Sequence, residues 1–156
     1  MYKPIRYSKC DHEDTSYNFS FLLCSKSYGQ IDSSLIYKKA EHIIKLIENK
    51  NIDSLISNST DSIRCILCNE AGIKNYIDSK IFFTERVQEI FTPTLISKLK
   101  SAPKSIVRQS EPYLSYIVYY KIIAKDEITP GHEGVDFGIW LRSDDLLKFT
   151  ALDKVP

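Results

Sequence analysis

Two stretches near the end of the chain decide its fold, Tyr113-Leu-Ser-Tyr-Ile-Val-Tyr-Tyr-Lys-Ile-Ile123 and Val135-Asp-Phe-Gly-Ile-Trp-Leu-Arg142. Both are rich in β-branched and aromatic residues, which favour strands, and both place apolar residues on the two faces that strand alternation defines. A loop with the proline and glycines of a turn, Thr129-Pro-Gly-His-Glu-Gly134, separates them. The sequence therefore predicts two central strands, over 114–123 and 136–141.

The earlier part of the chain has helical periodicity. Either Asp32 or Ser33 can cap a helix, and apolar residues then recur at spacings of three and four as far as Ile47. Helices that precede strands are typical of an α+β fold. The remaining pattern predicts a short helix from 52 to 56, a polar turn over 57–62, a short strand or buried segment over 63–68, a helical region over 80–100 broken at Thr92-Pro93, and a final strand over 149–155.

We predict one α+β domain, in which amino-terminal helices pack on a strongly curved antiparallel sheet. The length of 156 residues suits a single core. Residues 1–30 are rich in tyrosine and serine and are interpreted as an amino-terminal arm, in which residues 16–23 could add an edge strand. Residues 31–156 are interpreted as the domain itself.

Composition argues against two classes of partner. The chain has 21 basic and 20 acidic residues, well mixed, whereas nucleic-acid-binding proteins usually show a basic excess or a basic cluster. No apolar run approaches the roughly 20 residues that span a bilayer, and the apolar segment 17–24 follows acidic residues where a signal peptide would be positive. We therefore expect neither a nucleic acid nor a membrane partner. The expected location is cytoplasmic, or periplasmic if a leader has been removed before Met1.

The order of the predicted elements resembles the cone-shaped superfamily of nuclear transport factor 2 and ketosteroid isomerase. Those domains open with a long helix and a short one, as in Asn49-Lys-Asn-Ile-Asp-Ser-Leu-Ile56, and end in a curved antiparallel sheet. The closing Asp144-Asp-Leu-Leu-Lys-Phe-Thr-Ala-Leu-Asp153 resembles their last turn and strand. The stretch Ile90-Phe-Thr-Pro-Thr-Leu-Ile-Ser-Lys-Leu99 resembles the helix that closes the mouth of the cone in some bacterial members. The resemblance covers residues 33–155.

This resemblance implies three kinds of function, because fold alone does not fix activity. Enzymes of the superfamily carry an acid or base inside the cone, other members bind ligands or partners, and bacterial branches include immunity proteins. No catalytic motif is evident, so we expect a non-catalytic partner-binding protein without a cofactor, such as an immunity protein that neutralises a toxin by occlusion. The alternatives are a small-molecule binder that uses the cone cavity and, less favoured, an isomerase or dehydratase.

The four cysteines allow several chemistries. Cys65 and Cys68 have the spacing of redox pairs and of zinc half-sites, and Cys10 with His12 could complete four zinc ligands. We expect no metal, since a second pair at regular finger spacing is missing, and we expect Cys65 and Cys68 to be buried as small apolar residues. In an exported chain the cysteines could form two disulfides, of which Cys10–Cys24 with Cys65–Cys68 is the most local choice.

Three other titratable residues are candidates for acid–base catalysis. His132 lies in the glycine-flanked loop and is interpreted as part of a solvated turn, which suits neither positioning nor pKa tuning. Asp136 begins the following strand and would face inward if the sheet forms a cone. His42 lies on the flank of the apolar stripe and is expected to be a half-buried structural residue.

The aromatic residues of the predicted strands are the strongest candidates for binding. Alternation puts Tyr116 and Tyr120 on one face of their strand, and Tyr113 and Tyr119 on the other. One set must pack under the helices, while the other would cover the outer face, where aromatic side chains with polar tips are typical of protein interfaces. The expected partner is a protein, either a cognate toxin or a second copy of the chain. The candidate partner-binding residues are Tyr116, Tyr119, Tyr120, Trp140 and Arg142.

Overall fold

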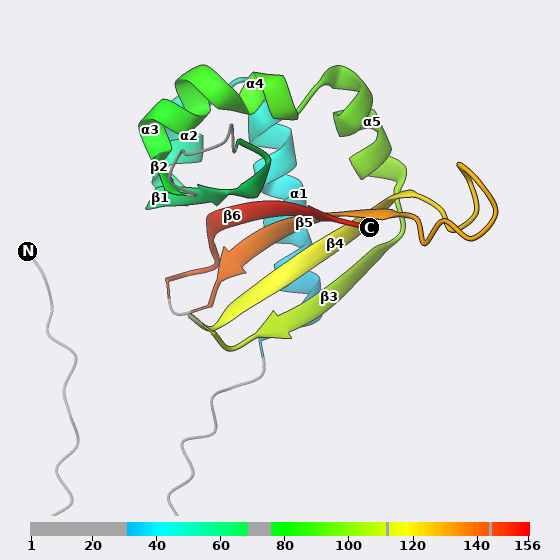
Figure 1. Cartoon of the computed structure of the whole chain (residues 1–156). Helices are drawn as coiled ribbons and strands as arrows, with labels where there is room; N and C mark the ends of the chain where they lie inside the picture. Colours follow the sequence, from blue (N-terminus) through cyan, green and yellow to red (C-terminus); the bar gives the residue numbers. More distant parts are fainter. Residues whose placement is uncertain (1–30, 69–75, 112, 144) are drawn as a thin grey trace, which may run out of the picture. The chain divides into compact units, whose positions relative to one another are not determined.

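A computed structural model describes residues 31–68, 76–111, 113–143 and 145–156. They belong to one compact unit, Ile31–Pro156, with helices concentrated in its first half and strands in its second (Figure 1). The α+β class is therefore confirmed. The helical elements are α1 (Ser33–Glu48), α2 (Ile52–Ser57), the 3₁₀ turn η1 (Ile66–Cys68), α3 (Ser79–Ile81), the π-helical turn η2 (Phe82–Arg86), α4 (Val87–Ile90) and α5 (Pro93–Ser101).

The strands form one curved, unclosed sheet in the order β2-β1-β6-β5-β4-β3. All neighbouring pairs are antiparallel except β1 and β6, which are parallel. The prediction of a purely antiparallel sheet is therefore wrong, because the strand from the helical half joins the sheet beside the last strand, and a long connection permits parallel pairing. The strands are β1 (Ser59–Cys65), β2 (Tyr76–Asp78), β3 (Lys104–Gln109), β4 (Ser115–Ile123), β5 (Val135–Arg142) and β6 (Lys148–Val155).

Helix α1 forms where the sequence predicted it. Asp32 caps it by accepting a hydrogen bond from the Ser34 backbone N–H at 2.9 Å. Its buried residues recur at helical spacing and face the sheet, so the helix is held by its apolar stripe. Those residues are Ile36, Ala40, Ile43, Ile44, Leu46 and Ile47.

Strand β1 occupies part of the stretch predicted to be a polar turn. Its backbone pairs with β6 from Ser59 onward, and the Ser59 hydroxyl, although buried, donates to the Leu55 carbonyl at 2.7 Å. The Ser59 hydroxyl thus bonds to α2, and the Thr60 hydroxyl donates to the Thr150 hydroxyl of β6 at 3.2 Å. Pairing with β6 therefore overrides the local preference for a turn.

The other predicted boundaries agree closely with the structure. The helical region is broken at Thr92, whose hydroxyl accepts the Leu95 N–H at 3.2 Å and caps α5, and Pro93 takes the first helical position. Strands β4 and β5 begin and end within a residue or two of the predicted central strands. The edge strand predicted over 16–23 lies outside the described residues.

Aromatic side chains fill the space between the helices and the sheet. The rings of Phe82 and Phe83 lie 5.1 Å apart, and Phe91 lies 5.4 Å from Phe137 on β5. Phe149 on β6 contacts both members of the first pair, at 6.2 and 6.1 Å. All five rings are completely or almost completely buried, so the interior beneath the sheet is a packed core.

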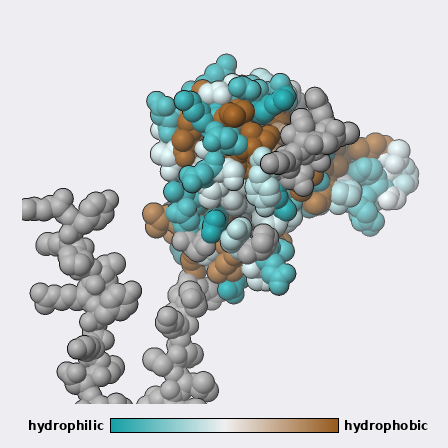
Figure 2. All heavy atoms as spheres, turned by 60° about the vertical axis from the view of Figure 1, so that its left-hand side comes forward, coloured by the Kyte–Doolittle hydropathy of each residue, from teal (hydrophilic) through white to brown (hydrophobic). Residues whose placement is uncertain are grey.

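The molecular surface mixes hydrophilic and hydrophobic side chains. Figure 2 brings forward the side that carries α3, β1 and β2, where hydrophobic atoms lie among hydrophilic ones. Exposed apolar side chains in and beside these elements include Ile66, Leu67 and Ile81. Within the described ranges, we find no helix with the length and apolar character needed to cross a membrane.

Replacing Phe149 by alanine tests the aromatic core. Because the ring is fully buried and contacts two others, we expect the free energy of unfolding to fall by about 3–5 kcal/mol. Denaturant unfolding measures this loss, and Phe149→Leu, which retains most of the volume, should lose clearly less. A loss below about 1 kcal/mol for the alanine variant would show that the core does not depend on this ring.

Candidate functional site

Strand β4 separates the candidate tyrosines onto two faces, as alternation predicted. Tyr116 and Tyr120 point toward the helices and pack with the core, whereas Tyr119 lies on the opposite face. Tyr120 is 0% exposed. The inclusion of Tyr120 among partner-contacting residues was therefore wrong, because a fully buried side chain cannot reach a partner. Tyr116 is half-buried against the same core, which leaves Tyr119, Trp140 and Arg142 as candidates on the other face.

This other face of the sheet is not covered by any helix of the described part of the chain, and Figure 1 looks onto it. We call it the uncovered face. The strand register arranges its side chains in rows that cross the sheet. One row runs through Val107, Ile117, Trp140, Ala151 and Arg64. The next runs through Ser105, Tyr119, Gly138 and Asp153.

Gly138 makes room for a buried carboxylate in the second row. A Cβ atom at this position would lie 2.1 Å from Asp153 Oδ1 and 2.9 Å from Tyr119 Cε1. The Asp153 side chain therefore occupies the space above the glycine and is only 7% exposed. Gly138 is needed here for space, not for an unusual backbone conformation.

Burial dominates the electrostatics of Asp153. It raises the pKa of this carboxyl, while the Trp140 indole, the Arg64 charge and the Tyr119 hydroxyl lower it by smaller amounts. Within the described residues, however, neither Asp153 Oδ1 nor Trp140 Nε1 completes a well-formed hydrogen bond. The contacts with Trp140, Arg64 and Tyr119 therefore offset only part of the effect of burial on the Asp153 pKa. The Tyr119 hydroxyl is affected in turn, since burial and then the Asp153 charge raise its pKa.

Two arginines lie over aromatic rings on the uncovered face. The Arg64 guanidinium is 4.5 Å from the centre of the Trp140 ring, and the Arg142 guanidinium is 4.1 Å from the centre of the Tyr113 ring. Such cation–π contacts hold the planar groups against each other. Tyr113 itself is 51% exposed, so this pair is directly accessible.

The two pairs border a shallow groove. A cavity of about 40 Å³ beside Trp140 and a larger polar hollow of about 400 Å³ share three of their lining residues, Tyr76, Tyr113 and Thr150. Arg64 lines the first and Arg142 the second. We call this feature the arginine–aromatic groove, defined by Arg64, Tyr76, Tyr113, Trp140, Arg142 and Thr150.

Other predicted candidates lie away from this groove. Asp136 is not directed inward, since it is paired across strands with Lys121, with Nζ and Oδ1 3.0 Å apart. His42 is exposed and not half-buried. His132 stays in its loop, where Nδ1 accepts the Gly134 N–H at 2.9 Å.

Cys65 and Cys68 are joined by a disulfide that links the end of β1 to η1. Both cysteines were expected to be buried as small apolar residues; Cys65 is buried, but Cys68, in the exposed turn η1, is only partly so. No group of three or more potential metal ligands occurs among the residues that the structure describes. Cys10, His12 and Cys24 lie outside those residues.

The contacts of Asp153 with Tyr119 and Gly138 have a structural role. Asp153 lines neither cavity of the groove, because Tyr119 and the backbone at Gly138 lie against it. Arg64, Gly138 and Asp153 were not predicted as site residues from the sequence. One signal could have suggested the contact between Asp153 and Gly138. It is a carboxylate next to the apolar pair Ala151-Leu152, together with a glycine in another predicted strand.

Comparisons of the chain with protein-family models, curated proteins and solved structures find no match. The functional argument therefore depends on the residues of this chain. The resemblance to the cone-shaped superfamily, drawn from element order, stays a prediction.

Replacing Gly138 by alanine tests the close contact with Asp153. The added methyl group must displace the carboxylate, and we expect the free energy of unfolding to fall by about 1–3 kcal/mol. In an Asp153→Ala background the same change should cost clearly less, because the obstructing oxygen is gone. A double-mutant cycle measured by denaturant unfolding gives this coupling. Additive losses would contradict the contact.

The raised pKa of Asp153 predicts a pH dependence of stability. Its folded-state pKa lies above the ordinary value of 3.8, so between these two values the folded state binds more protons than the unfolded state. This group's contribution therefore decreases stability as the pH rises through that window and increases it as the pH falls.

Asp153→Asn removes this contribution. As the pH is lowered, the free energy of unfolding of the wild-type chain should rise relative to that of the variant. At neutral pH the variant should be at least as stable as the wild-type chain. Urea titrations at several pH values measure it. A variant that is less stable at neutral pH, with an unchanged pH slope, would show that the charged carboxylate stabilises the fold.

Proposed function

We propose that the protein is a non-catalytic binding protein that attaches to another protein through the uncovered face of its sheet. The observation that carries this proposal is the pair of arginine–aromatic stacks, Arg64 on Trp140 and Arg142 on Tyr113, on a face without a covering helix among the described elements. Tryptophan, tyrosine and arginine are the residue types that dominate binding hot spots.

The shape of the face favours a protein over a small molecule. The cavity beside Trp140 holds only about 40 Å³, and the adjoining hollow of about 400 Å³ is lined mainly by polar residues, whereas sites for drug-sized ligands hold about 300–1,000 Å³ and are mostly apolar. An open sheet with shallow relief matches the broad contact of a protein interface. The rings offer apolar contact, and the guanidinium groups favour carboxylates, so the partner's surface should present both apolar and acidic side chains.

Two features support a non-catalytic role. Phenylalanines, including Phe91 and Phe137, fill the interior beneath the sheet. Because a filled interior leaves no room there for a substrate, this packing favours partner binding over catalysis inside the cone. Asp153, a buried acid, is covered by its neighbours on the opposite face. An acid in that position lacks the access that a general acid or base requires.

The finer proposal is an immunity protein that neutralises a toxin by occlusion. It comes from the resemblance to the cone-shaped superfamily, and the helix-first order with a long helix, a short helix and closing strands supports it. The Cys65–Cys68 disulfide favours the periplasmic location over the cytoplasmic one, because disulfides persist in oxidising compartments.

Tyr113 is the best residue for testing the interface. Its ring is half exposed, so Tyr113→Ala should leave the melting temperature nearly unchanged, whereas Trp140 is partly buried under Arg64 and its loss would also affect folding. The first partners to test are the proteins encoded by neighbouring genes. Each is expressed with and without this chain, and the growth of the cells is compared. For a neighbouring-gene product that stops growth unless this chain is co-expressed, Tyr113→Ala should weaken binding by about thirtyfold.

Leu35→Ala is the matched control, since Leu35 is equally exposed (53% against 51%) but lies on α1. Calorimetric titration should show unchanged affinity for this variant. If a second copy of the chain occupies the face instead, size-exclusion chromatography will show a dimer that Tyr113→Ala dissociates. That result would support the proposed surface but contradict a toxin as the partner. Equal affinity of both variants and the wild-type chain would refute the proposed surface.

A further inference from the structure

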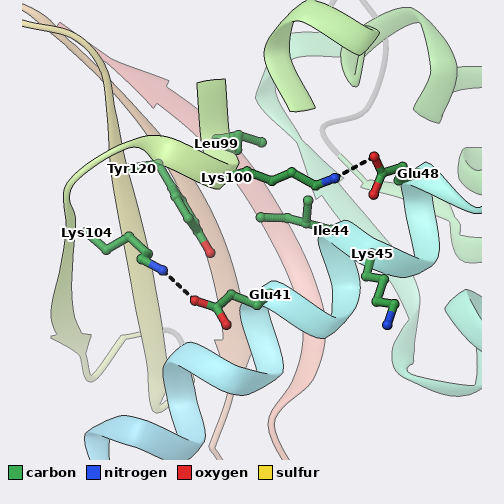
Figure 3. Close-up of a pocket in the computed structure, with 8 residues that line it drawn as sticks. All are labelled: Glu41, Ile44, Lys45, Glu48, Leu99, Lys100, Lys104 and Tyr120. Atoms are coloured by element: carbon green, nitrogen blue, oxygen red, sulfur yellow. Dashed lines mark hydrogen bonds and ion pairs between the residues drawn. The ribbon is translucent and has the colours of Figure 1, made fainter. Parts of the chain in front are cut away.

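A cleft between α1 and α5 lies on the helix side of the sheet (Figure 3). Its volume is about 420 Å³, within the ~300–1,000 Å³ range of small-molecule sites. The core beneath the sheet is filled by phenylalanines, so this cleft is a separate hollow beside the helices. It is also independent of the partner surface proposed above.

Two ion pairs span the mouth of the cleft. Glu41 and Glu48 project from one face of α1, seven residues apart, which corresponds to about 10 Å along a helix. Glu41 pairs with Lys104 at the start of β3, and Glu48 pairs with Lys100 of α5 at 2.5 Å. Figure 3 shows both pairs reaching across from α1. The cleft therefore opens between two salt bridges.

Charged side chains line the mouth of the cleft, whereas its interior is apolar except for one hydroxyl. Ile44 and Leu99 form its walls and are 3% and 0% exposed. The ring of Tyr120 reaches from β4 toward α1, with its hydroxyl turned to the side of Glu41 (Figure 3). This hydroxyl is buried and has no hydrogen-bond partner among the described residues. A ligand oxygen that reached it would gain a hydrogen bond without displacing another.

The charges around the cleft argue for an uncharged ligand. Lys100 and Lys104 are each neutralised by a glutamate, and Lys45 points away from the opening (Figure 3). Burial raises the pKa of Tyr120, so its hydroxyl remains protonated and acts as a donor. The complementary ligand group is an acceptor such as a carbonyl oxygen.

We propose that the cleft binds a small uncharged organic molecule, whose apolar ring lies between Ile44 and Leu99 and whose carbonyl oxygen accepts a hydrogen bond from Tyr120. Tyr120 and Leu99 are fully buried while the Glu41–Lys104 pair is in place, so the ligand reaches them only when this pair shifts. That pair is partly exposed, with side chains 52% and 29% accessible, and exposed pairs hold their geometry weakly.

Acetophenone and α-methylstyrene are matched probes for this site, because they differ only in the ketone oxygen, which the second replaces by a methylene group. Titration of the full chain, followed by the methyl NMR signals of Ile44 and Leu99, gives both dissociation constants. Acetophenone should bind more tightly, and Tyr120→Phe should weaken its binding about three- to tenfold while leaving α-methylstyrene unchanged. Tyr116→Phe, on the same face of β4 but outside the cleft, should change neither.

Three outcomes would overturn the proposal. The first is that neither probe shifts the two methyl signals. The second is that Tyr120→Phe leaves acetophenone binding unchanged, or that benzoate binds as well as acetophenone. The third is a marked fall in the melting temperature of Tyr120→Phe, because it would show that the hydroxyl is already bonded within the protein. The expected result is an unchanged or higher melting temperature.

Discussion

The parallel pairing of β1 with β6 is the constraint on which the rest of the structure depends. It joins a strand from the helical half of the chain to the carboxy-terminal strands, and it sets Arg64 directly opposite Ala151. Ala151 in turn lies opposite Trp140. Because alanine leaves the space between them open, the guanidinium reaches the indole ring. Without this pairing, neither the arginine–aromatic groove nor the continuous sheet above the helices would form.

The two faces of the sheet have different roles, one in stability and the other in association. The face toward the helices buries large apolar rings and supplies the stability that a small domain requires. The uncovered face carries a buried carboxylate, stacked arginines and half-exposed tyrosines, which are poor core material but suit association. Gly138 contributes to the uncovered face, because the space above it accommodates the Asp153 carboxylate.

Periodicity predicted most of the elements, since α1 and strands β4 to β6 are specified by the spacing of their own apolar residues. The same alternation placed Tyr116 and Tyr120 together, but it could not say which face the helices would cover, so Tyr120 was assigned to the wrong environment. The start of β1 at Ser59 was also missed, although the predicted strand or buried segment over 63–68 overlaps its end. The hydroxyl of Thr60 in β1 bonds to Phe149 and Thr150 of β6, about 90 residues away, and local sequence does not specify the register of such distant strands. The contacts of Arg64, Gly138 and Asp153 depend on that register and were missed with it.

Site-specific photocrosslinking tests the use of the uncovered face most directly. A photoreactive phenylalanine analogue placed at position 113 lies in the groove, and the same analogue at position 35 lies on exposed α1. With a neighbouring-gene product whose toxicity this chain suppresses, the proposed interface predicts an efficient crosslink from position 113 and little or none from position 35. Efficient crosslinking from position 35 alone would contradict it and would place the partner on the helices.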